Sequence, residues 1–72
     1  MNTLTRTPDM DLQDFQLAAL IEARRIGMLD PSERESALRK LTAEVHALKQ
    51  PGEQLENLYG RMREAARIGA ST

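Results

Sequence analysis

Apolar residues recur every three or four positions along most of the chain, which is the spacing of one face of an α-helix. This spacing predicts three helices, over about residues 9–27, 31–49 and 52–68. No stretch alternates apolar and polar residues for long enough to form a strand. We therefore expect an all-α protein with one helical domain over residues 9–69, a flexible N-terminus over residues 1–8 and a frayed C-terminus over residues 70–72.

The first helix has two credible starts and one clear end. Thr7–Pro8 and Asp11 are both residue types that favour helix N-termini, and either can begin the helix. Acidic residues then occupy the first turns, where negative charge interacts favourably with the helix dipole: Asp9, Asp11 and Asp14. Gly27 is expected to end the helix in the left-handed conformation, with Met28 or Leu29 folding back over the last turn.

Proline marks the start of the other two helices. Asp30, Pro31 and Glu33 match an N-cap, a first helical position and the acidic position of a capping box. The second helix should end at Lys49 or Gln50, because Pro51 disfavours helical geometry in the residue before it. The third helix is expected to open at Pro51-Gly52-Glu53. Such short connections favour antiparallel neighbours.

The second and third helices each have a single apolar face. In the second helix this face consists of Leu38, Leu41, Val45 and Leu48. In the third helix it consists of Leu55, Leu58, Tyr59, Met62 and Ala66. Each of these helices needs only one apolar neighbour to bury its face.

The first helix has apolar residues on opposite faces. One face carries Leu12, Phe15, Ala19, Ala23 and Ile26, and the other carries Leu17, Ile21 and Met28, with Leu20 between them. Two further helices can cover only one of these faces, and each large apolar side chain left in water forfeits about 1.5–3 kcal/mol. We therefore expect a three-helix bundle, or a helical hairpin with an extra helix, that is completed by homodimerisation.

The predicted protein interface lies on the second face of the first helix. It comprises Leu17, Leu20, Ile21, Arg24, Arg25 and Met28, with the arginine stems lying over apolar surface while their charged groups meet an acidic group. The partner is a second copy of the chain, another protein, or both. The alternative is a self-sufficient monomeric bundle, because single exposed leucines are common on protein surfaces.

Charge and aromatic content disfavour nucleic-acid binding. The formal net charge is -1, and the only aromatic residues are Phe15 and Tyr59. Phosphate neutralisation needs a basic patch, and single-strand binding needs stacking side chains. A helix-turn-helix formed by the second and third helices remains an alternative, with a turn at residues 49–52. Its bases, Arg61, Arg63 and Arg67, are offset by Glu53, Glu56 and Glu64.

The sequence offers little for catalysis, and we expect no enzyme, cofactor or metal. There is no cysteine, and the single histidine, His46, has no carboxylate or histidine one turn away on its own helix. The glycines are isolated, so no phosphate-binding loop is present. The longest apolar run, Leu17 to Ile21, is far too short to cross a membrane, and residues 1–14 do not resemble a signal peptide. A cytoplasmic location is expected.

Residues 17–41 resemble the short helical hairpin domains called SHOCT. The resemblance rests on Gly27 followed by two apolar residues, on Asp30 and Glu33 at the helix start, and on Leu41. Arg34 stands where that family usually has an aromatic residue. The resemblance implies a helical hairpin, and no function is carried over from it.

These features favour a small protein-binding module of bacterial or phage type. It would act as an adaptor, a chaperone-like partner or an inhibitory regulator by occupying the surface of another protein. The alternatives are a nucleic-acid-associated regulator and a structural subunit of a larger assembly.

Overall fold

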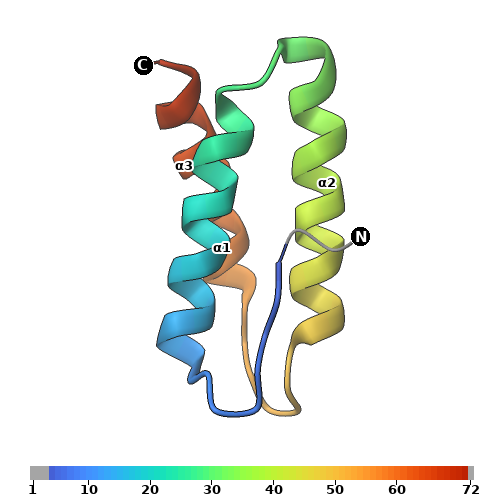
Figure 1. Cartoon of the computed structure of the whole chain (residues 1–72), viewed down its shortest axis with the longest axis vertical. Coiled ribbons are helices and arrows are strands. Elements are labelled where there is room, and N and C mark those ends of the chain that lie inside the picture. Colours follow the sequence, from blue (N-terminus) through green and yellow to red (C-terminus); the bar gives the residue numbers. More distant parts are fainter. Residues whose placement is uncertain (1–3, 72) are drawn as a thin grey trace.

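Three helices account for most of the chain in the computed structural model, which describes residues 4–71. They are α1 (Leu12–Gly27), α2 (Pro31–Leu48) and α3 (Glu56–Ala70). In Figure 1, α1 rises, α2 descends beside it and α3 rises behind α1. The described residues contain no strand, so the predicted all-α class with three helices is confirmed.

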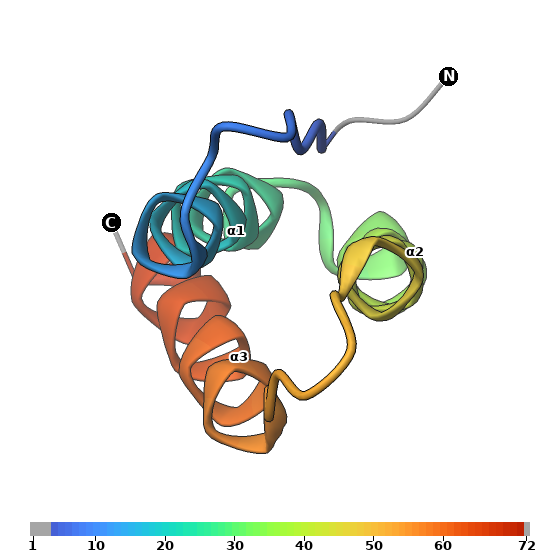
Figure 2. The same cartoon turned by 90° about the horizontal axis from the view of Figure 1, so that it is seen from below.

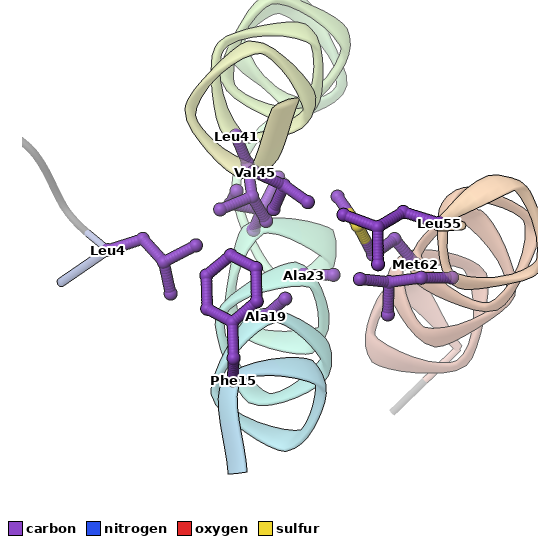
Figure 3. Close-up of a cluster of buried hydrophobic side chains, with 10 residues drawn as sticks. Leu4, Phe15, Ala19, Ala23, Leu41, Val45, Leu55 and Met62 are labelled. Atoms are coloured by element: carbon purple, nitrogen blue, oxygen red, sulfur yellow. The ribbon is translucent and has the colours of Figure 1, made fainter. Parts of the chain in front are cut away.

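The core lies between the three helices and is built largely from the predicted apolar faces. It includes Phe15, Ala19, Ala23 and Ile26 of α1, Leu41 and Val45 of α2, and Leu55, Leu58, Met62 and Ala66 in or next to α3. Figure 3 shows Phe15 pointing towards Val45. Leu55 and Met62 lie at the right of the cluster, opposite Leu4. The predicted inner face of α1 is therefore confirmed, and α1 packs against both other helices.

The backbones of α1 and α3 touch where the two helices cross. A Cβ atom added to Gly27 would lie 2.0 Å from the carbonyl oxygen of Ala66, and one added to Gly69 would lie 2.2 Å from that of Arg24. Neither glycine could carry a side chain without moving backbone atoms. Figure 2 shows α3 directly against α1, while α2 stands further away. The residues of α2 that are buried in the core are Leu41 and Val45.

This close crossing corrects the role predicted for Gly27. The helix does not end in a left-handed residue, because among residues 4–71 only Gly52 has a positive φ, at 89°. The C-cap is Met28, whose backbone is right-handed and whose side chain is exposed. Leu29 instead packs against the core. Gly27 is needed for helix packing rather than for chain reversal.

The starts of α1 and α2 lie at expected residues, but only one of the two N-cap side chains makes a capping hydrogen bond. Asp11 caps α1 by accepting a hydrogen bond from the Asp14 amide at 2.8 Å, which selects the later of the two expected starts. Asp30 precedes α2 as expected, but its side chain makes no capping hydrogen bond. Its carbonyl oxygen accepts from the amides of Glu33 and Arg34 at 2.9 Å.

The third helix begins at Glu56, later than the predicted residue 52. Pro51 and Gly52 form a turn, and the Glu53 carboxylate accepts a hydrogen bond from the Gln50 amide at 2.9 Å. The helix then continues to Ala70, beyond the predicted end at residue 68, and Ser71 caps it. Thr72, predicted to fray, lies outside the described residues.

Residues 4–10 form a strap along the helices. Leu4 is 4% exposed, and its side chain points towards Phe15 (Figure 3). Its amide donates a hydrogen bond to Glu44 at 3.2 Å. Figure 2 shows this strap passing over α1 towards α2, on the side away from α3. Within the segment that was expected to be flexible, residues 1–8, Leu4 and Arg6 make contacts with the helices and their connections, and residues 1–3 lie outside the described part of the chain.

An ion pair ties the strap to the α2–α3 connection. Arg6 donates from Nη1 and Nη2 to the two carboxylate oxygens of Glu53, both at 2.7 Å, and it also reaches the carbonyl oxygen of Leu48. The guanidinium lies 4.4 Å from the ring centroid of Phe15. The hydrogen bonds from Arg6, followed by the one from Gln50, lower the pKa of Glu53 to about 2. The positive φ of Gly52 takes the chain out of helical geometry, and Glu53 pairs with Arg6 ahead of the first turn of α3.

Candidate protein-binding surface

The apolar residues on the second face of α1 are exposed. Leu17 is 57% exposed, Ile21 62% and Met28 68%. On the opposite side of the same helix, Phe15, Ala19 and Ala23 are fully buried. None of the described residues covers the exposed side chains, so the placement expected from helical periodicity is observed.

These side chains belong to a longer row on α1 that also contains two charges. The row consists of Asp14, Leu17, Ile21, Arg24 and Met28, and we call it the outer face. Its residues are separated by alternating steps of three and four, which keeps them along one side of a helix. The outer face therefore carries an acid near its N-terminal end, apolar residues in the middle, and a base followed by a methionine near its C-terminal end.

The charged side chains on and beside the outer face differ in their partners. Within residues 4–71, the Asp14 carboxylate and the Arg24 guanidinium make no hydrogen bond or ion pair, and both residues are exposed. Arg25 pairs with Glu22 one turn earlier on α1, and this hydrogen bonding raises the pKa of Arg25. Asp14 and Arg24 thus remain available to another molecule, while Arg25 is already engaged.

Leu20 lies at the edge of the outer face and is half-buried. It packs against the core and lines a hollow of about 210 Å³ between α1 and α3. The other residues lining this hollow are Gln13, Gln16, Leu17 and Arg61. Leu20 therefore links the core to the outer face and contributes less exposed apolar surface than Leu17 or Ile21.

Sequence periodicity missed two residues at this surface. Asp14 was assigned only to the helix start, although its spacing of three residues from Leu17 places it on the same side of α1. Ile68 was expected to be the last residue of the third helix, yet α3 continues past it to Ala70 and leaves Ile68 44% exposed. It adjoins Gly69, which touches the α1 backbone at Arg24. The Asp14 spacing was visible in the sequence, whereas the α1–α3 crossing was not.

The remaining surface offers little chemistry. A cleft of about 260 Å³ lies between α2 and α3, lined by Glu35, Leu38, Arg39, Thr42, Tyr59 and Arg63. Its Glu35 and Arg39 pair with each other at 3.3 Å on exposed positions of α2. His46 is exposed, and residues 4–71 contain no cluster of three or more histidine or carboxylate side chains placed to hold a metal ion.

The connection between α2 and α3 bears on the helix-turn-helix alternative. It runs from Lys49 to Leu55, whereas a helix-turn-helix has a turn of three or four residues. Of the arginines on α3, Arg67 pairs with Glu64 of the same helix, and this hydrogen bonding raises the pKa of Arg67.

In the described chain, no helix has the length and apolar character needed to cross a membrane.

Comparison with known proteins adds no information about this surface. Comparison with protein families, with curated proteins and with solved structures found nothing that matches this chain. The resemblance of residues 17–41 to SHOCT domains therefore has no support from a family match.

Proposed function

We propose that this chain is a non-enzymatic protein-interaction module of the cytoplasm that binds through the outer face of α1. It would serve as an adaptor or an inhibitory regulator by occupying the surface of another protein molecule. The observation that carries this proposal is the exposure of Leu17, Ile21 and Met28 on a helix whose opposite side is fully buried.

Helix α1 contributes apolar residues to two surfaces, and burial of the second surface would stabilise a complex. Burying a large aliphatic side chain contributes about 1.5–3 kcal/mol, so covering the outer face is worth several kcal/mol. A domain of this size, with no disulfide to support it, has a small net stability. The free energy gained when association buries Leu17 and Ile21 would therefore be large relative to the free energy of unfolding of the domain.

The polar groups around the apolar side chains also suit a protein partner. Arginine is enriched at protein interfaces because its stem packs against apolar surface while its guanidinium binds carboxylates. Arg24 stands on the outer face without an intrachain ion pair among the described residues. A nucleic-acid partner has less support, because the α2–α3 connection is long and Glu64 already engages Arg67.

Site-specific photo-cross-linking in cells tests this proposal. A photoreactive amino acid replaces Ile21 on the outer face or, as the matched control, Ala43, which is exposed on α2. We expect protein adducts from position 21 and few or none from position 43. The adducts are identified by mass spectrometry, so a second copy and another protein are distinguished. Equal labelling from both positions, or no adduct from position 21, would contradict the proposal.

A further inference from the structure

The outer face carries complementary groups at its two ends. Asp14 lies in the first turn of α1, Arg24 lies in the last turn, and Leu17 and Ile21 lie between them. Alternating steps of three and four residues form the seam along which two helices pack side by side. This face therefore has the spacing of a helix-pairing seam, with opposite charges at its ends.

We propose that the occupant of the outer face is a second copy of this chain, with the two α1 helices antiparallel and related by a two-fold axis that crosses the outer face at the level of Ala19, midway between Leu17 and Ile21. This inference deepens the proposed function and rests on it. Leu17 and Ile21 are each two residues from Ala19, and Asp14 and Arg24 are each five residues from it. The axis thus sets Leu17 of each copy against Ile21 of the other, and Asp14 of each copy against Arg24 of the other.

The antiparallel direction follows from charge. A parallel pair in register would set Asp14 against Asp14 and Arg24 against Arg24, which is repulsive at both ends. The antiparallel pair forms two equivalent Asp14–Arg24 contacts, as a two-fold interface requires. Both side chains are free for these contacts, since neither has a polar partner within residues 4–71. Each copy supplies both members of the complementary pair.

The surroundings of α1 leave room for this contact. Figure 2 shows α2 to one side of α1, α3 below it and the strap above it, and no other element of the described chain lies on the side of α1 that faces away from α2. Met28 is 68% exposed and extends the apolar part of the outer face beyond Arg24 in each copy.

Charge reversal tests the register. The variants Asp14→Arg and Arg24→Asp are analysed alone and as an equimolar mixture by sedimentation over a range of concentrations. Each variant alone sets like charges against each other twice, and we expect its dimer dissociation constant to rise on the order of tenfold or more. In the mixture, one chain carries only bases on the outer face and the other only acids. The mixture should therefore form a heterodimer about as tight as the wild-type dimer.

Matched variants separate interface effects from effects on the helices. Glu33 is an exposed acid in the first turn of α2, so Glu33→Arg disturbs a helix start away from the outer face and should leave dimerisation unchanged. Circular dichroism reports whether each variant is folded. Should Asp14→Arg unfold, Asp14→Asn removes the charge at the same position, and its dimer should also be weaker than wild type.

The outcomes distinguish this inference from the proposed function. A wild-type dimer that neither charge reversal weakens would overturn the antiparallel register. A wild-type chain that stays monomeric at every concentration would overturn the second copy as occupant. In that case, cross-links from position 21 to another protein would still support the proposed function, whereas their absence would contradict both.

Discussion

Replacing Gly27 with alanine should open the contact between α1 and α3. The new Cβ atom would lie 2.0 Å from the carbonyl oxygen of Ala66 and within 3 Å of two further backbone atoms of that residue. These are backbone atoms of a helix, so no side-chain rotation can relieve the contact. The helices would have to separate by about 1 Å to bring the Cβ to the shortest distance that real Cβ atoms show.

The expected cost of Gly27→Ala exceeds its helix-forming benefit. Overpacking a well-packed contact costs about 1–3 kcal/mol, and a gap of 0.5–1 Å forfeits about a quarter to a half of the dispersion energy of the separated atoms. Alanine in place of glycine in a helix returns about 0.5–1 kcal/mol. We therefore expect Gly27→Ala to lower the free energy of unfolding by about 1–2 kcal/mol.

Gly60 provides the matched control for this prediction. It lies within α3, and a Cβ atom added to it would meet nothing within 4 Å. Gly60→Ala should therefore raise the free energy of unfolding by about 0.5–1 kcal/mol. Thermal or urea unfolding, followed by circular dichroism at one fixed protein concentration, measures both variants. A difference of 1 kcal/mol corresponds to about 4–8 °C in Tm for a domain of this size.

The two glycine variants should move stability in opposite directions. If the free energy of unfolding of Gly27→Ala were equal to or above that of Gly60→Ala, the close crossing of α1 and α3 would be refuted. Such a result would mean that the backbone at Ala66 lies further from α1 than described, and that Gly27 acts only at the helix end, as its sequence position suggested.

Two further perturbations test the strap and its ion pair. Leu4→Ala should lower the free energy of unfolding by about 2 kcal/mol in urea denaturation because Leu4 is buried beside Phe15, and a change below about 0.5 kcal/mol would indicate an unpacked segment. The lowered pKa of Glu53, about 2 against an ordinary 4.5, means that its pairing with Arg6 stabilises the fold above about pH 4.5 and is lost as the pH falls towards 2. Acid unfolding of Glu53→Gln should therefore depend less on pH across this window than that of wild type or of the control Glu56→Gln, and three identical profiles would show that Glu53 is unpaired.

Local patterns were enough to predict the helices and their inner faces. The inner residues of α1, such as Phe15 and Ala19, recur at helical spacing, and burial against neighbouring helices follows from that spacing alone. The start of α2 at Pro31 was also predictable, because proline at a first helical position is a local preference. The exposed apolar row of α1 follows from the same periodicity, since a helix with two apolar sides cannot bury both within three helices.

The remaining features depend on contacts between distant parts of the chain. Glycine occurs both at helix ends and at close helix crossings, and only the position of Ala66 shows which applies to Gly27. Leu4 and Arg6 have no periodic neighbours, so nothing in the local sequence indicates that they pack against Phe15 and Glu53. The pairing of Glu53 with Arg6 ahead of α3 was likewise not predictable, because the two residues are far apart in the sequence.

The decisive measurement for the outer face is sedimentation equilibrium of the wild-type chain and Ile21→Asp, with helicity recorded by circular dichroism. Ile21 is 62% exposed, so the substitution should leave the monomer folded. We predict a concentration-dependent dimer for the wild type and a helical monomer for the variant. Two folded monomers of equal stability would contradict the association of chains through α1.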